Sequence, residues 1–305
     1  MQKFGNSFAA DFGLGFAPTA MSHRTRIIML GAVTVATGIA VALLPRIAQP
    51  PDYHNFADQR TLLGVPNFFN VISNVPFLLV GVWGLMLVLG RRPSDRQPFI
   101  TPVERWPYVV FATGVALTCF GSAYYHLAPD NARLVWDRLP MTLAFMSLLS
   151  ALLMERVNLR AGLVALGPLL VVGLASVMQW YASEQRGAGD MRLYLMVQFY
   201  TLVLILLVLG LFPARYTRGA DLVVAMGFYV LAKILELLDK QIFNLGHVLS
   251  GHTLKHLAAA VGIYWVFRMV ARRRAVVQAD LDLWNRRKAL VDAALTEYVE
   301  RRRKK

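Results

Sequence analysis

Long, almost uncharged apolar blocks are the feature that most limits how this chain can fold. Eight of them recur along the sequence, near residues 26–46, 66–90, 106–126, 139–155, 161–181, 193–213, 220–239 and 252–271. An α-helix needs about 20 apolar residues to cross a hydrocarbon core about 30 Å thick. Lipid offers no partner to the polar backbone groups of a loop or a lone strand, so helices are the natural spanning elements. The pattern predicts an all-α integral membrane protein with eight spans.

The composition agrees with residence in a membrane. Of the 305 residues, 56% are hydrophobic and 16% are charged, and the mean hydropathy is +0.48, which is more apolar than an ordinary soluble domain. The single cysteine, Cys119, lies inside an apolar block, so it forms no intramolecular disulfide and reads as a small core residue.

The first block, residues 26–46, has two readings. Basic residues precede it, as they precede the apolar region of a secretory signal peptide. The apolar run from Ile27 to Leu44 is long for such a region, and no clear small-x-small cleavage site follows it. A retained transmembrane helix is the favoured reading.

The net charge of +14 indicates topology rather than a nucleic-acid partner, because the basic residues flank apolar blocks instead of alternating with aromatic residues on a polar domain. If the N-terminus is cytoplasmic, the cytoplasmic segments hold 23 of the 32 Lys and Arg residues. The count predicts that both termini are cytoplasmic. Residues 272–305 form a basic, amphipathic tail, which predicts either a helix lying on an anionic lipid surface or a solvated extension.

Ionisable and polar residues gather near one end of the third and fourth blocks. Ser122 and His126 are four residues apart and therefore share one helical face. Asp137 follows eleven residues after His126, just before the predicted fourth span, and a short return loop would bring it back to the level of His126. Taken singly, Asp137 reads as a helix cap and Ser122 as a hydroxyl bonded to its own helix.

His252 and His256 form a second cluster at the start of the last block. Their spacing places two imidazoles on one helical face, and His126 offers a third. Three histidine ligands leave the fourth position of zinc open, as in catalytic zinc sites. The topology, which does not depend on the histidines, places both clusters at the same extracytoplasmic face.

A third cluster precedes the second span and consists of Asp52, Asn55, Asp58 and Asn67. Their hard oxygen atoms suit calcium, although two carboxylates make a weak site. A polar loop with Asx turns is the alternative, and both readings stay open.

Two further histidines and one charged stripe carry no site. His54 and His247 lack a convincing second partner and are predicted not to be ligands. On the seventh block, Glu236 is predicted to form local ion pairs with Lys233 and Lys240.

Three motifs together resemble the alkaline ceramidase family: Gly121-Ser122-x-x-x-His126, Asp137-x-x-Pro140-Met141 and Ser250-Gly251-His252-x-x-x-His256. That family belongs to a superfamily of seven-helix membrane proteins that includes the adiponectin and progestin receptors and haemolysin III-like proteins. The similarity runs from about Asp52 to Ala271. It implies four parts: a cytoplasmic N-terminal segment (1–25), an additional N-terminal transmembrane helix (26–46), a ceramidase-like seven-helix membrane domain (47–271) and the basic tail (272–305).

The resemblance also implies a chemistry. His126, His252 and His256 would hold Zn²⁺, Asp137 would act as general base, and Ser122 would donate a hydrogen bond to the developing oxyanion. The reaction would be hydrolysis of the N-acyl amide bond of ceramide or a related N-acyl lipid. The calcium-binding segment of the family is similar to the third cluster here, but Asn55 and Asn67 stand where acidic residues are expected.

Two rival classes remain beside the enzyme. A receptor or haemolysin III-like protein would use the same zinc site for structure, yet the presence of Ser122 and Asp137 beside three histidines favours chemistry. A transporter would distribute ionisable groups through the membrane depth, whereas here most of them gather at one face.

Overall fold

The computed structural model describes residues 21–91 and 97–276, which form helices joined by short loops. The described elements, in chain order, are α2 (His23–Leu43), η1 (Pro51–His54), α3 (Phe68–Ile72), α4 (Val75–Leu89), η3 (Pro102–Glu104), α5 (Arg105–Leu127), α6 (Asn131–Leu152), η4 (Leu153–Val157), α7 (Leu159–Gln185), α8 (Arg192–Leu195), η5 (Met196–Tyr200), α9 (Thr201–Leu211), α10 (Ala220–Leu237), α11 (Asp239–Asn244) and α12 (Gly251–Arg272). The all-α fold class is therefore confirmed for the described residues.

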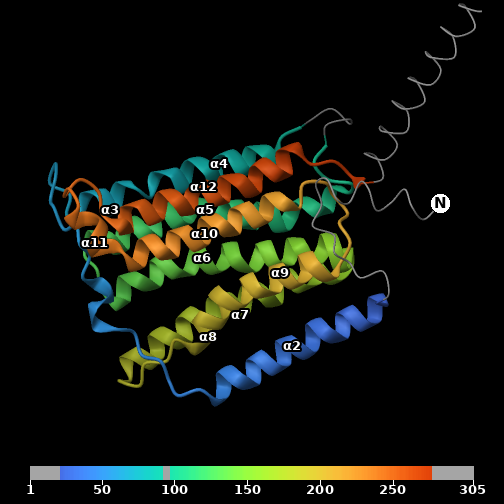
Figure 1. The fold of residues 1–305 in the computed structure, drawn as a ribbon, viewed down its shortest axis with the longest axis horizontal. Helices are drawn as coiled ribbons and strands as arrows, with labels where there is room; N and C mark the ends of the chain where they lie inside the picture. The colour runs from blue at the N-terminus through green and yellow to red at the C-terminus, as the bar shows by residue number, and fades with distance from the viewer. Residues whose placement is uncertain (1–20, 92–96, 277–305) are drawn as a thin grey trace, which may run out of the picture.

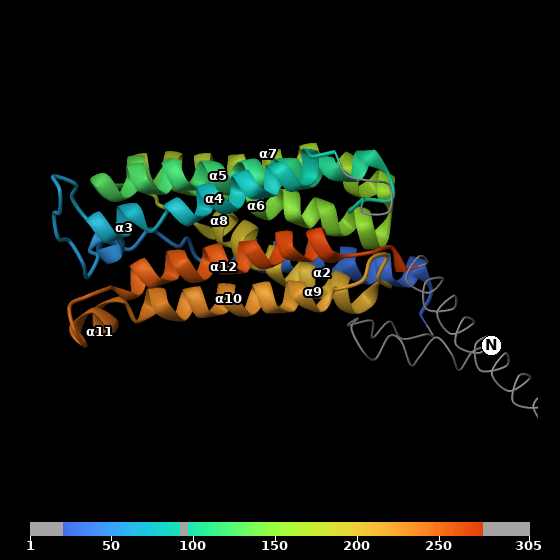
Figure 2. The same ribbon diagram turned by 90° about the horizontal axis from the view of Figure 1, so that it is seen from above.

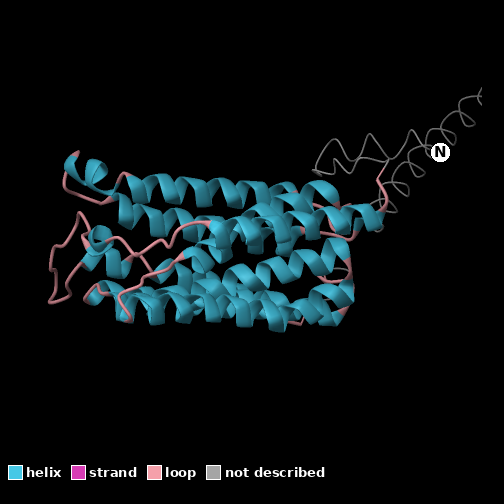
Figure 3. Ribbon diagram, turned by 90° about the horizontal axis from the view of Figure 1, so that it is seen from below, coloured by secondary structure: helices cyan, strands magenta, loops and turns pink. Residues whose placement is uncertain are grey.

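The long helices run nearly side by side and form one elongated bundle (Figure 1). Consecutive helices α4, α5, α6 and α7 pack as antiparallel neighbours, and α10 packs against α12. Seen from above, α12, α10 and α9 form the side of the bundle opposite α5 and α7 (Figure 2). Short helices and loops gather at one end, which we call the α3/α11 end (Figure 3).

Seven of the helical segments are long and apolar enough to cross a membrane, which is the pattern of a multi-pass membrane protein. The described residues form eight long helical segments, as predicted, but only seven of them have the length and composition of a membrane span. The seventh predicted span, α10, is a helix of 18 residues that carries Asp221, Lys233 and Glu236, and it falls outside the seven. Its charges face partners within the bundle, so its place is set by packing against α12 rather than by its own hydropathy.

The fourth span starts eight residues earlier than predicted. Asp130 caps α6 by accepting a hydrogen bond from the Arg133 backbone N–H at 2.7 Å, so the helix begins at Asn131. Asp137 therefore lies inside α6, in its second turn, and not in a loop before the helix. Pro140 sits in the helix interior instead of its first turn.

Helix α2, the first predicted span, lies apart from the other helices and beside α8 and α9 (Figure 1). Two contacts fix it there. Arg192 donates hydrogen bonds to the last carbonyl groups of α2 at Ala42 and Leu44, and the Tyr200 hydroxyl donates to Thr34 Oγ1 at 3.0 Å. The predicted tail from residue 277 onward and the first 20 residues lie outside the described residues.

At the other end of the bundle, buried charges pair with one another. Arg273 donates to Glu155 Oε1 at 2.6 Å and to the Tyr108 hydroxyl at 3.1 Å. Both members of the Arg273–Glu155 ion pair are almost completely buried. We call this end of the bundle, which contains Tyr108, Glu155 and Arg273, the paired end.

Candidate metal centre

Three histidines from two helices meet at the α3/α11 end of the bundle. His126 lies in the last turn of α5, and His252 and His256 lie in the first two turns of α12. They expose only 1%, 4% and 4% of their surface. One ring nitrogen of each lies within 4.8 Å of the others, so these three residues could hold one metal ion. The structure thus brings together the three ligands predicted from the sequence.

The ring nitrogens have the arrangement of a ligand set. Nε2 of His126 lies 3.3 Å from Nε2 of His252, and the three ring centroids are 4.9 to 5.1 Å apart. Buried polar atoms normally have partners, yet Nδ1 of His126 has none. Three imidazoles facing one point in a dry site fit a divalent metal that accepts nitrogen ligands.

Neighbouring groups fix the orientation of each ring. Ser73 Oγ lies 2.8 Å from Nδ1 of His256 and donates its own proton to the Asn70 carbonyl. When the Ser73 hydroxyl donates to that carbonyl, Nδ1 of His256 carries the proton of the shared hydrogen bond, which leaves Nε2 free to bind a metal. The Phe56 ring lies 4.7 and 4.4 Å from the His126 and His252 rings and covers them.

The start of α12 is held in place by polar contacts. Ser250 caps the helix through the Thr253 backbone N–H at 3.1 Å. Asp239 accepts from the backbone N–H of His252 at 2.7 Å and from that of Ala57 at 2.8 Å. Asp239 thereby joins the histidine helix to the loop that carries Phe56.

Ser122 and Asp137 lie near each other across the α5/α6 contact and line the same cavity. The contact is close because Pro140 has no N–H to offer the Trp136 carbonyl, four residues earlier. That carbonyl lies against Gly121, and a Cβ on residue 121 would clash with it. The predicted meeting of Ser122 and Asp137 is present, although helix packing rather than a return loop produces it.

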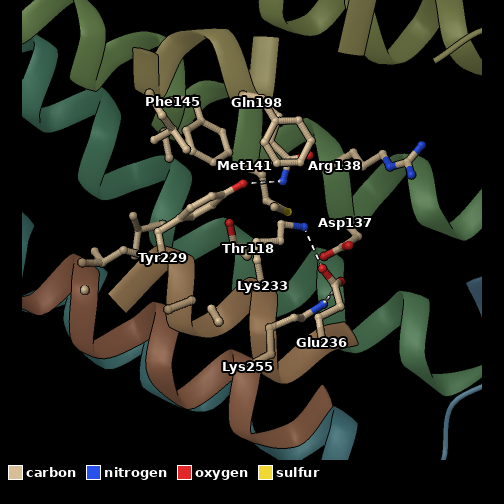
Figure 4. Close-up of a pocket in the computed structure, with 18 of the residues that line it drawn as sticks. Thr118, Asp137, Arg138, Met141, Phe145, Gln198, Tyr229, Lys233, Glu236 and Lys255 are labelled. Atoms are coloured by element: carbon tan, nitrogen blue, oxygen red, sulfur yellow. Dashed lines mark hydrogen bonds and ion pairs between the residues drawn. The ribbon is translucent and has the colours of Figure 1, made fainter. Parts of the chain in front are cut away.

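A cavity of about 410 Å³ extends from the histidines into the bundle. His256, Ser122 and Asp137 line one part of it, and apolar side chains of α6, α9, α10 and α12 line most of the rest. Figure 4 shows Asp137 opposite Lys233, Glu236 and Lys255. Glu236 pairs with Lys233 at 2.7 Å and with Lys255 at 2.8 Å. The predicted Glu236–Lys240 pair is absent among the described residues, because Lys255 of α12 takes that place.

The four residues predicted as calcium ligands have other contacts. The Asp58 carboxylate accepts two hydrogen bonds from the Arg60 guanidinium, from Nε at 2.8 Å and from Nη2 at 2.7 Å. Burial alone would raise the pKa of the Asp58 carboxyl, but Arg60 holds it below the usual range. Asn55 accepts from Gln59, Asn67 donates to the His126 carbonyl, and Asp52 is exposed. These contacts favour the polar-loop reading, and calcium binding stays a prediction.

The two histidines predicted not to be ligands lie outside the cluster. Both ring nitrogens of His54 are engaged, by the Tyr125 hydroxyl at 2.8 Å and by Asn131 at 3.0 Å. His247 is exposed and packs against the Phe243 ring.

Sequence reasoning missed three residues that shape the site. Ser73 and Phe56 contact the histidines from segments remote in the chain, and the sequence indicated them only as part of the polar region around the predicted calcium ligands. Arg138 was visible only as the neighbour of Asp137, yet it is 4% exposed and lines the cavity. A buried arginine next to a candidate catalytic residue was the available signal.

Comparison with known proteins found no matching family model and no curated protein with significant similarity to this chain.

Proposed function

We propose that the protein is a zinc-dependent intramembrane amidase that hydrolyses the N-acyl amide bond of ceramide or a related N-acyl lipid. One observation carries the proposal: three buried histidine nitrogens converge, and one of these histidines, His256, lines a largely apolar cavity together with Ser122 and Asp137. The resemblance of the three motifs to the alkaline ceramidase family supports the same chemistry.

His126, His252 and His256 would hold the metal. Zn²⁺ bound there supplies a Lewis acid for the amide carbonyl and lowers the pKa of a bound water molecule. Asp137 takes a proton from the attacking water and returns it to the departing nitrogen. Overall, a C–O bond forms at the acyl carbon, the C–N bond breaks, and a fatty acid and an amino lipid are released. Ser122 orients Asp137 and donates its hydrogen bond to the acyl oxygen as negative charge develops there.

The cavity suits a substrate that stays in the membrane. Its walls are mostly apolar, and Ser122, Asp137 and His256 are among the polar residues that line it. We assign the helices from α3 to α12 to the ceramidase-like core and α2 to an addition. The distribution of Lys and Arg favours cytoplasmic termini and places the α3/α11 end at the extracytoplasmic face. The basic tail would contact anionic lipid.

A non-enzymatic receptor or haemolysin III-like protein with a structural zinc site is the alternative. The experiment that separates the two is to measure zinc content and fatty-acid release by the purified protein on a panel of N-acyl lipids. The proposal expects about one zinc per chain and acid release from at least one lipid, abolished by a chelator and restored by zinc.

Asp137→Asn is the decisive variant. We expect it to keep its zinc and to lose activity by about 10² to 10⁴-fold, because a general base contributes on that order. Asp130→Asn is the matched control, since asparagine caps a helix as well as aspartate does. Stoichiometric zinc without acid release from any lipid would favour the receptor, and a protein without zinc would contradict both readings.

A further inference from the structure

Arg138 is a buried cation without a carboxylate partner among the described residues. Its guanidinium donates to Gln49 Oε1 at 2.6 Å, lies 3.8 Å from Met191 Sδ and lies 5.7 Å from the centroid of the Tyr53 ring. It lies 4.1 and 4.4 Å from the ring centroids of Trp180 and Tyr194. All these partners are neutral, so the charge itself is not balanced.

The nearby carboxylates are occupied elsewhere. Asp137 precedes Arg138 in α6 and attracts it electrostatically, but Figure 4 shows the two side chains turned apart, and they form no ion pair. Glu184 accepts from the Gln49 backbone N–H at 2.9 Å and from Trp180 Nε1 at 3.1 Å. Glu236 is held by two lysines. Arg138 therefore keeps an unpaired charge in a site where an unpaired charge costs several kcal/mol.

Two donors at this place have no acceptor. Nη1 of Arg138 and Nε2 of Gln49 are both buried and unpartnered. Gln49 and Arg138 line the same cavity as Ser122, Asp137 and His256. An arginine fork beside an amide N–H₂ group is the donor arrangement that binds carboxylates and phosphates.

The charge balance of the whole cavity points the same way. Its wall contains two carboxylates, Asp137 and Glu236, and three basic side chains, Arg138, Lys233 and Lys255. Because Glu236 is shared by both lysines, the excess positive charge remains, and a divalent metal at the histidines would increase it. Such a site attracts an anionic ligand over a neutral one of the same shape.

We propose that the preferred substrate is an N-acyl lipid whose amine portion carries a carboxylate or a phosphate, and that Arg138 and Gln49 bind this anionic group. This inference rests on the proposed function for the amide bond, but the binding preference stands independently of turnover. It separates the substrate from neutral ceramide, which has no anionic group for Arg138.

The test compares lipids that differ only in this group. Binding of N-palmitoylglycine, its methyl ester and N-palmitoyl-phosphoethanolamine to the purified full-length protein is measured by calorimetry in detergent, with and without zinc. Fatty-acid release is measured in parallel. We expect at least one anionic lipid to bind about tenfold or more tightly than the ester, the size of a charge-assisted hydrogen bond. A carboxylate or a phosphate preference identifies which group the site recognises.

Two variants assign the preference to Arg138. Arg138→Gln removes the charge, and Gln49→Glu supplies an internal counter-ion, so both should reduce the preference to about twofold or less while binding of the methyl ester persists. Arg133→Gln is the matched control, because it removes a basic residue from the same helix outside the cavity. It should leave the preference unchanged.

The outcomes separate the two proposals. Equal binding of the ester and both anionic lipids by the wild-type protein would overturn this inference, even if all three were hydrolysed. A preference that survives in both Arg138→Gln and Gln49→Glu would also overturn it. Tight, Arg138-dependent binding of an anionic lipid that is never hydrolysed would support the inference and count against the amidase.

Discussion

The two ends of the bundle both bury charged and polar side chains, but they satisfy them in different ways. At the paired end, Arg273 has Glu155 and Tyr108 as partners, and Glu104 has Arg215 and Tyr216. Each buried carboxylate there faces a cation of the same chain. One donor there, Nη2 of Arg273, has no partner within the described ranges, but the carboxylates of Glu155 and Glu104 are both neutralised by arginines, so the arrangement reads as structural.

At the α3/α11 end, several buried ligand and donor atoms have no partner within the part of the chain that the structure describes. Three imidazoles face one another, Nδ1 of His126 has no partner, and Arg138 lacks a counter-ion among the described residues. Polar groups that evolve for stability alone are normally satisfied within the fold. The comparison teaches that buried charges paired within the chain do not mark a functional site, whereas several unsatisfied ligand and donor atoms gathered at one end do.

The largest effect that can break this comparison is loss of the metal. We expect His126→Ala to lower zinc affinity by at least about 100-fold, because even outer contacts to metal ligands contribute about 10 to 100-fold. Zinc content of the purified protein measures it. His247→Asn is the control, since His247 is exposed, and asparagine tolerates its left-handed backbone, with φ of 52°. If His126→Ala and wild type had the same zinc content, the α3/α11 end would not be a metal site, and the contrast between the two ends would fail.

A change at the paired end should affect stability alone. Arg273→Met leaves Glu155 as an uncompensated buried charge, so we expect the free energy of unfolding to fall by about 3 to 5 kcal/mol. Zinc content of the folded fraction should stay at the wild-type value. Adding Glu155→Gln to the same chain should recover part of the loss. If the folded fraction of Arg273→Met contained less zinc than the wild-type protein, the two ends would be coupled.

Close helix packing at the α3/α11 end gives a smaller effect. Gly121→Ala places a methyl group against the Trp136 carbonyl, so we expect a loss of about 1 to 3 kcal/mol of stability. Separation of α5 from α6 should also lower amidase activity more than zinc content. Gly167→Ala is the matched control, because Gly167 lies in α7, is exposed, and has open space where the methyl group would go. It should be neutral or stabilising by about 0.5 to 1 kcal/mol.

The smallest effect concerns a pair at the α3/α11 end that is already satisfied. The Arg192 guanidinium holds the pKa of the Asp190 carboxyl below its usual range. Because the folded pKa lies below the unfolded value of about 3.9, the pair stabilises the fold above about pH 4, and the contribution disappears as pH falls through the folded value. We expect it to be about 0.2 to 1 kcal/mol.

Thermal unfolding of wild type and Asp190→Asn measures this contribution. The two melting temperatures should differ near neutral pH and converge only when the pH falls below the lowered folded pKa of Asp190, where both side chains at position 190 are neutral. A constant difference at all pH values would mean that the contact acts through packing and not through charge.

The apolar blocks by themselves determined that this is an all-helical chain with long, membrane-compatible segments, because the length and period of an apolar run dictate the element that buries it in lipid. The spacing of His252 and His256 determined that they share a face. The boundaries of α6 were less accessible, because Asp130 and not Asp137 supplies the cap, and both are plausible caps in the sequence.

The tertiary structure alone decided which distant residues complete the site. Ser73 fixes His256 across 183 positions, and Gln49 reaches Arg138 across 89. Such contacts depend on how helices cross and not on local propensity, so no motif announces them. The same holds for α10, which carries Asp221, Lys233 and Glu236 in an otherwise apolar sequence and pairs Glu236 with Lys255 on α12. Hydropathy determined which segments are able to cross a membrane, and packing decided which of their polar atoms meet.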